Sequence, residues 1–493
     1  MYRLIILCML AGMTVLPVRA ETSPTEDEWT FNFGPLISRQ RDIHGHMRLR
    51  ILGPLFERAK SDEGQSLTAI RPLYSRFEDP ASERSRQELL WPVGFSKHFR
   101  DDNHGRFLLA FWTNFDTTDP QSRYRFWLLP FYFQGRDIHG DRYAAVFPIG
   151  GRVHEILGQD RITFALFPLF MRTELNQIVT HDYVWPIVSH TEGKGIYRFR
   201  VFPFYGQSRH RDRFNKKFVM WPFWTSAEYY YPHSSGSGWI LFPFYGQMRL
   251  TDQRSWTVLP PFFRVTRGTR QNLALLPWPF IQRRTGEINQ TYVWPIAGQK
   301  RTRGLETRFY AWPIVREERI DRRDYLVKRR YVFPIYYSDV REAHEPAAPL
   351  ALDEPVPRGE RVTNYQKVWP LISYRREGES SRLRMLDLWP LKESHPIERN
   401  YAPFWTLYQV TRLEEATETE LLWGMYRGRS DGDEYRSRSL FPVVEWERDD
   451  RDDESLRRWS LLKGLIGYKR TDTTRRFQLL YLLRWTQDQE NDQ

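Results

Sequence analysis

Hydrophobic residues gather in short clusters along this chain, one about every 17 to 21 residues, and charged residues and glycine fill the intervals. Most clusters contain an aromatic residue or leucine, then proline, then one or two large apolar residues. A fixed period indicates that one small supersecondary unit is copied along the chain, and that its copies bury each other's apolar surface. Representative repeat positions are Trp185, Pro186, Phe202, Pro203, Trp221, Pro222, Phe242, Pro243, Trp294, Pro295, Trp312 and Pro313.

Each cluster predicts a β-strand. The apolar runs are short and rich in aromatic and β-branched residues, and proline inside a helix would cost about 3 kcal/mol. Side chains alternate as in a strand: the odd-numbered residues from Tyr197 to Tyr205 share one face, and Arg198 and Arg200 lie on the other. Proline within a strand removes a ladder hydrogen bond, so Pro203 and its equivalents predict a bulge that bends every strand at one level.

The array holds about 24 such clusters, joined by short links that contain glycine. Links this short cannot hold a crossover helix, so the sequence predicts an all-β antiparallel meander of about 24 strands from a repeat of about 18 residues. Two near-copies of one turn, Arg41–Gly45 and Arg136–Gly140, support hairpin connections. A single β-repeat domain is predicted over residues 30–486.

Four segments stand apart from the array. Residues 1–20 have the charged start, apolar stretch and small final residue of a secretory signal peptide. Residues 21–29 are predicted to be a disordered leader and 487–493 a polar tail, and the proline- and acid-rich stretch 338–364 is predicted to be an inserted mobile loop. The only cysteine, Cys8, lies in the predicted signal peptide, so an exported protein without disulfides is expected.

Three architectures are compatible with such an array of strands. An even strand number, an aromatic excess and an export signal favour a large closed β-barrel in the outer membrane. Clusters that are apolar on both faces, and prolines inside strands, favour instead a soluble propeller-like or stacked β-sheet repeat array. A parallel β-helix is a third architecture, although each period has only one strand-like run beside a highly charged turn. The pattern leaves these alternatives open.

The excess of basic residues indicates which class of partner the protein could bind. After residue 20 the chain has 71 basic and 61 acidic residues, and both kinds are interleaved. A basic excess on an exported protein favours outer-membrane lipid or lipopolysaccharide as a partner, with anionic polysaccharide as an alternative, and nucleic acid is not expected. The candidate contacts to headgroups or anionic ligands are Arg209, Arg211, Arg213, Arg283, Arg284, Arg329 and Arg330.

No catalytic, metal-binding or cofactor-binding set is predicted. His44 and His46 have a spacing that a metal pair could use, but they lie in a turn that reads as solvated. Asp387 is the one acid inside an apolar cluster, where it could face a polar lumen or pair with an arginine. The regular tryptophans are better explained by packing or an interfacial belt than by ligand stacking.

The expected function is therefore that of a non-enzymatic outer-membrane β-barrel, a channel or an envelope structural component. The alternative is a soluble periplasmic or surface β-repeat scaffold that binds anionic glycan or lipopolysaccharide.

Overall fold

The computed structural model describes residues 30–343, 361–451 and 455–488, and the predicted signal peptide, leader and final residues 489–493 lie outside this part. The described residues form one antiparallel meander of 46 strands, in which each strand pairs with the strands before and after it along the chain. Two short helices interrupt the meander between β37 and β38. The all-β meander predicted from the repeat is confirmed.

The first arm of the sheet comprises β1 (Phe31–Phe33), β2 (Ile37–Arg41), β3 (Met47–Ile51), β4 (Phe56–Lys60), β5 (Ser66–Ile70), β6 (Tyr74–Asp79), β7 (Arg84–Leu89) and β8 (Gly94–Phe99). The first half of the body comprises β9 (Asp102–Phe107), β10 (Ala110–Asn114), β11 (Tyr124–Leu128), β12 (Tyr132–Arg136), β13 (Arg142–Val146), β14 (Gly150–Ile156), β15 (Gln159–Ala165), β16 (Phe170–Leu175), β17 (Ile178–Tyr183), β18 (Val188–Gly193), β19 (Ile196–Val201), β20 (Tyr205–His210), β21 (Phe214–Val219) and β22 (Trp224–Tyr231).

The second half of the body comprises β23 (Ser234–Leu241), β24 (Tyr245–Leu250), β25 (Gln253–Val258), β26 (Phe263–Gly268), β27 (Gln271–Leu275), β28 (Ile281–Gly286), β29 (Asn289–Val293), β30 (Ala297–Thr302), β31 (Leu305–Tyr310), β32 (Val315–Asp321), β33 (Tyr325–Val332), β34 (Tyr336–Ala343), β35 (Arg361–Val368) and β36 (Ile372–Glu377). The second arm comprises β37 (Ser380–Met385), α2 (His395–Asn400), α3 (Ala402–Trp405), β38 (Tyr408–Leu413), β39 (Ala416–Leu421), β40 (Tyr426–Asp431), β41 (Tyr435–Leu440), β42 (Val444–Asp449), β43 (Leu456–Leu461), β44 (Ile466–Arg470), β45 (Thr474–Leu479) and β46 (Leu483–Asp488).

The prediction of about 24 strands with proline in their interiors is wrong. Each repeated proline lies in a tight turn, so one apolar cluster supplies the end of one strand and the start of the next. Val201 ends β19, Phe202–Phe204 form the turn, and Tyr205 opens β20 opposite Val201. No hydrogen bond between strands is lost, because proline stands in the turn, where strand pairing does not require the N–H group that it lacks. The peptide bond before Pro203 and before most other repeated prolines is cis.

The meander therefore has two unlike edges. The proline edge, as we call it, consists of the turns between strands that contain the repeated aromatic-proline sequence or its apolar equivalent. The loop edge, on the opposite side, consists of charged and glycine-containing turns such as Lys194–Gly195, Arg211–Arg213 and Arg303–Gly304. Most strands hold five or six residues, so at about 3.3 Å per residue the two edges are only about 20 Å apart.

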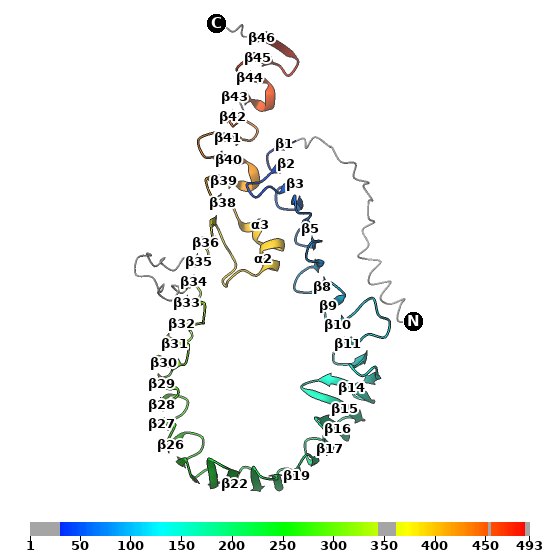
Figure 1. Ribbon diagram of the computed structural model, residues 1–493, viewed down its shortest axis with the longest axis vertical. Coiled ribbons are helices and arrows are strands. Elements are labelled where there is room, and N and C mark those ends of the chain that lie inside the picture. Colours follow the sequence, from blue (N-terminus) through cyan, green and yellow to red (C-terminus); the bar gives the residue numbers. More distant parts are fainter. Residues whose placement is uncertain (1–29, 344–360, 452–454, 489–493) are drawn as a thin grey trace, which may run out of the picture.

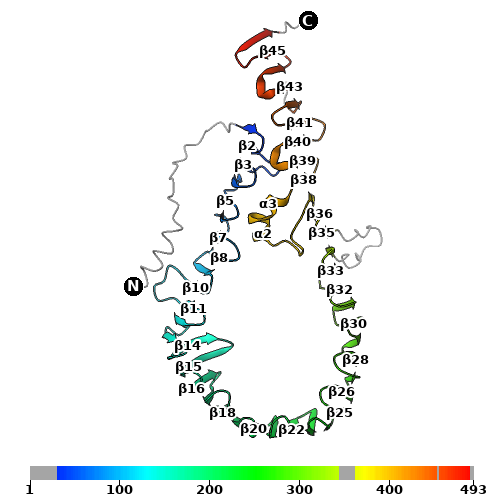
Figure 2. The same ribbon diagram turned by 180° about the vertical axis from the view of Figure 1, so that it is seen from behind.

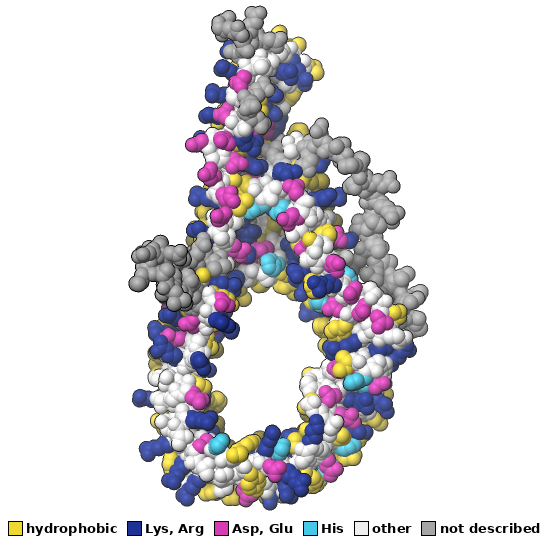
Figure 3. Space-filling view, in the orientation of Figure 1, with side chains coloured by type: hydrophobic (Ala, Val, Ile, Leu, Met, Phe, Trp, Pro, Cys, Tyr) yellow, Lys and Arg dark blue, Asp and Glu magenta, His cyan; other side chains and the backbone are white. Residues whose placement is uncertain are grey.

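The long, narrow sheet curls into a ring from which the end of the second arm projects (Figure 1). The two arms converge near β1–β3 and β38–β40, and α2 and α3 lie between them in both views (Figures 1 and 2). The space-filling view shows that side chains do not fill the opening of the ring (Figure 3). Backbone hydrogen bonds do not close the sheet, so the predicted hydrogen-bonded barrel closure is not observed.

The helical segment and the insertion depart from the sequence-based expectations. The apolar clusters that contain Leu388 and Trp405 are part of the repeat that predicts strands, but the chain leaves the sheet after Met385 and forms α2 and α3 before it returns. A loop is expected over residues 338–364, but 338–343 and 361–364 belong to β34 and β35. Residues 344–360 lie outside the described part.

Burial in this sheet is inverted relative to an ordinary globular protein. Among the described residues, more polar and charged side chains than hydrophobic ones are buried, whereas most large exposed side chains on the proline edge are hydrophobic. A compact cluster of buried hydrophobic residues lies on β12–β15 and comprises Phe133, Tyr143, Ala145, Val153 and Phe164. Folded proteins normally bury apolar side chains and expose charge, so the exposed apolar surface is the feature to explain.

Candidate functional site

The face of the sheet that carries Arg50, Glu57 and Glu88 faces the other arm and the two helices, so we call it the inner face. Adjacent residues of a strand point to opposite faces, and the register then assigns every strand residue to the inner or the outer face. On the outer face, the residues next to the proline edge form one continuous row, which we call the outer row.

The outer row contains no charged residue and no polar side chain other than tyrosine hydroxyls and the tryptophan N–H. From β16 to β25 its members are Phe170, Tyr183, Val188, Val201, Tyr205, Val219, Trp224, Leu241, Tyr245 and Val258. The same composition, with occasional alanine and glycine, holds from Phe33 on β1 to Leu483 on β46. At β27–β28 the row continues through Leu276 and Ile281, which share a backbone hydrogen bond.

The turns of the proline edge extend this apolar surface beyond the row. Residues that follow the proline, such as Phe204, Phe244 and Ile296, are more than half exposed. The residues before the proline stack along the edge: the ring centroids of Phe202 and Trp221 are 5.5 Å apart, and other neighbouring pairs have similar spacings. Outer row and turns together form an apolar band along one edge of the ring, and among the described turns charged residues interrupt it only at Arg71, at Lys463 and in the helical segment.

The predicted repeat residues, from Trp185 to Pro313, therefore share one edge of the molecule. The predicted arginines do not form one site. Arg209 lies on β20, and Arg211 and Arg213 lie in the following turn of the loop edge. Arg283 and Arg284 are adjacent on β28 and point to opposite faces.

Arg329 and Arg330, the last predicted pair, are also adjacent in one strand, β33. Arg330 pairs with Glu317 at 2.9 Å, and Arg329 lies 3.5 Å from Asp339. Since each already has a carboxylate close by, this pair is less available to an external anion than the arginines of the loop edge.

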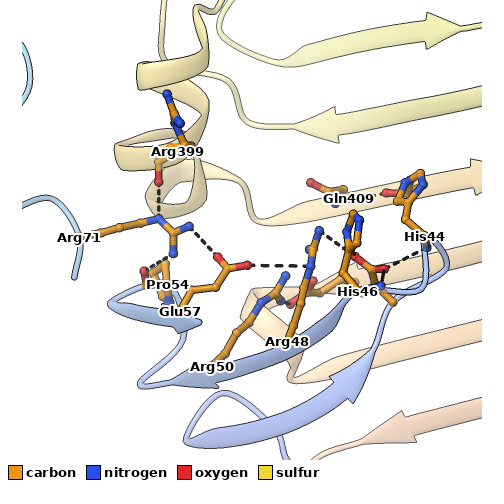
Figure 4. A network of polar contacts seen from close by, with 12 residues as sticks. His44, His46, Arg48, Arg50, Pro54, Glu57, Arg71, Arg399 and Gln409 are labelled. Atoms are coloured by element: carbon orange, nitrogen blue, oxygen red, sulfur yellow. Dashed lines mark hydrogen bonds and ion pairs between the residues drawn. The ribbon is translucent and has the colours of Figure 1, made fainter. Parts of the chain in front are cut away.

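The ring is closed by a cluster of buried and partly buried charges between the arms (Figure 4). Arg50 of β3 pairs with Glu420 of β39 at 2.5 Å. Arg71 donates to Glu57 at 2.6 Å and to the backbone oxygen of Arg399, at the end of α2, at 2.5 Å. These residues come from both arms and from the helical segment, so side chains replace the backbone ladder at this junction. We call these five residues the closure cluster.

Opposite charges dominate the ionisation of this cluster. Burial alone would raise the pKa of Glu57, but Arg71 and Arg50 outweigh it and hold that pKa well below its usual range. The same balance gives Glu420 a pKa of about 2, with Arg50 and Arg427 as the opposing cations. Burial lowers the pKa of Arg427, whereas the pKa of Arg50 is raised despite its burial. Distance explains the difference, since Glu420 is 2.5 Å from Arg50 and 3.5 Å from Arg427.

The first copies of the repeat are adapted to this junction. Glycine replaces the aromatic residue before proline at Gly34 and Gly53, with φ of +56° and +60°. A Cβ at Gly34 would lie 2.4 Å from Cγ of Phe441, and one at Gly53 would lie 3.3 Å from Cβ of Trp423. Aromatic side chains of the second arm thus lie against these two turns. In most other copies, the residue before the proline provides the aromatic side chain itself. In the third copy, Arg71 takes the same position.

A cavity of about 310 Å³ lies beside the cluster, lined by the two arms and the helical segment. Its charges are nearly balanced, with six arginines facing five carboxylates and His44. Asp42 accepts the backbone N–H groups of His44 and His46 at 2.9 Å each, so its carboxylate organises this turn. No group of histidines, cysteines and carboxylates suited to a metal ion occurs within the described residues.

Asp387 has a structural partner. Its carboxylate lies 2.6 Å from Nζ of Lys367, and both side chains are almost fully buried. Of the two possibilities that the sequence left open, a polar lumen and an arginine partner, neither is observed, because the partner of Asp387 is a lysine of β35. The ion pair fixes the chain at the point where it leaves the sheet for α2.

No protein-family model matches this chain, and no curated protein matches it significantly in sequence. None of the helices among the described residues is long and apolar enough to cross a membrane.

Proposed function

We propose that this protein is a non-enzymatic structural protein of the bacterial cell envelope that seats its ring on a membrane, with the proline edge in the lipid. The outer row carries the proposal, because it stays apolar along the whole sheet while the opposite edge is charged. Exposed apolar patches of this extent mark interaction surfaces. A membrane is a partner that could cover one edge of a ring continuously.

The depth of the apolar band and the length of the strands favour insertion into one leaflet of the membrane. The apolar band covers the turn and the outer row, about three residues or 10 Å of extended chain. Interfacial proteins bury their apolar faces about 5–10 Å deep in the membrane. Strands of five or six residues are shorter than the 9–11 residues that transmembrane strands need. We therefore propose attachment to the outer membrane by one edge, with the charged loop edge in water.

Vesicle co-sedimentation tests this function. Phe204→Ser, Phe223→Ser and Phe244→Ser combined would remove three turn residues that are 59%, 53% and 64% exposed. Burial of phenylalanine contributes about 1.5–3 kcal/mol when complete. Even partial insertion of three predicts at least a tenfold weaker partition, because tenfold is about 1.4 kcal/mol.

The matched control combines Ile138→Ser, Leu157→Ser and Leu305→Ser, which change exposed apolar residues of the loop edge. This variant should bind vesicles as the unchanged protein does. Equal losses in both triple variants, or no binding by the unchanged protein, would disprove the proposed orientation.

A further inference from the structure

The end of the second arm, β42–β46, which we call the C-terminal arm, projects beyond the place where the arms meet (Figures 1 and 2). Its outer face carries three parallel rows. The row next to the proline edge is Val444, Leu461, Ile466, Leu479 and Leu483. The second row is Trp446, Trp459, Tyr468, Phe477 and Trp485. The third row is Arg448, Arg457, Arg470 and Arg475, and Arg436 of β41 extends it.

The order of the rows follows the cross-section of a membrane surface. Aliphatic residues suit the hydrocarbon, aromatic residues suit the interface, and basic residues suit anionic headgroups. The rows lie about two residues apart along each strand, so aliphatic and arginine rows are separated by about 13 Å of extended chain. On the ring body, by contrast, the level of the third row mixes charges and neutral residues, as at Arg209, Asn215 and Glu228.

The arginine row is unfavourable without a counter-charge. Like charges directly opposite each other destabilise an antiparallel pair, and neighbouring strands are only about 4.8 Å apart. Arg448 has a carboxylate partner, Asp450, at 2.6 Å. Asp472 lies near enough for its charge to act on Arg470 and Arg457, but across the described residues no carboxylate forms an ion pair within 4.0 Å with Arg436, Arg457, Arg470 or Arg475. An external row of anions would remove the repulsion, and guanidinium groups bind phosphate with good geometry.

We infer that the C-terminal arm binds the phosphate headgroups of anionic phospholipids through this arginine row, and so directs the ring to anionic membrane. The inference rests on the proposed function, since it names the lipid that the proline edge meets. A soluble polyanion would match the arginines, but it would leave the aliphatic and aromatic rows of the same face in water. Lipid therefore accounts for all three rows.

The test compares vesicles of phosphatidylcholine with vesicles that contain 30% phosphatidylglycerol, using the full chain. The combined variant Arg457→Gln, Arg470→Gln and Arg475→Gln keeps the side-chain length and removes three charges. We expect its preference for phosphatidylglycerol to fall at least tenfold, and the preference of the unchanged protein to weaken with salt. A matched control, Arg142→Gln with Arg303→Gln and Arg412→Gln, removes three exposed arginines that lie far apart along the sheet, two in strands and one in a turn, and should retain the preference.

Thermal unfolding without lipid separates binding from folding. The midpoint of the arginine-row variant should stay the same or rise, because the repulsion is relieved, and a lower midpoint would assign these arginines a structural role and overturn the inference. An unchanged lipid preference in this variant would also overturn it, while leaving the proposed seat on lipid intact. Binding of inorganic polyphosphate as tightly as of anionic vesicles would show a soluble partner instead. Failure of the unchanged protein to bind any vesicle would instead count against the proposed function itself.

Discussion

The residue before the repeated proline is aromatic or leucine in most copies, but it is glycine at positions 34 and 53 and arginine at position 71. In the structure these three turns meet the second arm or α2, and partners from there occupy the place of the missing aromatic ring. The exceptions to the repeat thus mark the junction of the ring. The sequence alone contained this signal, because the exceptions occur together at one end of the array.

Gly34→Ala tests the packing of that junction. The new Cβ would lie 2.4 Å from Cγ of Phe441, at a φ of +56°. We expect a loss of unfolding free energy of about 2–4 kcal/mol, of which about 1–3 kcal/mol reflects overpacking, measured by urea unfolding. Gly378→Ala is the control, since its φ is +57° and no atom lies within 4 Å of the new Cβ. Equal losses for both variants would mean that Phe441 moves aside freely.

At the scale of elements, the sequence predicted strand composition and side-chain alternation correctly but not the turns. Tyr197, Phe199 and Val201 share the outer face of β19, as the alternation indicates. The same alternation predicts that one strand continues through Pro203 to Tyr205, and this prediction is wrong, because the chain reverses at Phe202–Phe204. The sequence did contain a signal for the turn. Proline inside a strand loses a hydrogen bond to the neighbouring strand, whereas proline in a turn loses none, so the repeated prolines favour turns.

The helical segment could not be predicted from the repeat. Asp387 stands where other copies have an aromatic residue, and its pairing with Lys367 depends on a strand twenty positions earlier in the chain. Ser394 and Pro396 give a plausible helix start, but a helix of six residues gains its stability from packing rather than from propensity. Here that packing is a hydrogen bond of 2.6 Å from Asn400 to Glu88 on the first arm.

At the scale of the whole molecule, ring closure depends on side chains that are distant in sequence. Arg50 and Glu420 meet across the junction, and nothing in the local pattern of either strand pairs them. The period could be derived from the hydrophobic and charged positions, but the proline edge could not, because the same pattern places proline inside strands. The curvature of the sheet could not, because it follows from how 46 short strands twist and pack together.

Acid should open the ring. The folded-state pKa values of Glu57 and Glu420 lie below the ordinary value near 4.5, and that of Glu420 is about 2. Their stabilisation of closure is therefore complete above about pH 4.5 and is lost as the pH falls towards 2. Spin labels on Arg58→Cys and Arg412→Cys, in a Cys8→Ser background, would report the separation of the two arms.

We expect one narrow distance at pH 7 and a longer, broader distribution below pH 3. Glu420→Gln should broaden the distribution at pH 7, because Arg50 loses its charged partner. A distance that stays narrow down to pH 2 would show that the closure cluster does not hold the arms together.

The orientation of the two edges on a membrane tests the account most directly. A fluorescent label on Ile296→Cys of the proline edge, 68% exposed, is compared with one on Leu157→Cys of the loop edge, 86% exposed, each in the Cys8→Ser background. On vesicles, the label at position 296 should be quenched by brominated lipid and protected from aqueous iodide, and the label at position 157 should behave in the opposite way. Equal access of iodide to both labels on membrane-bound protein would contradict the central claim that the proline edge lies in lipid.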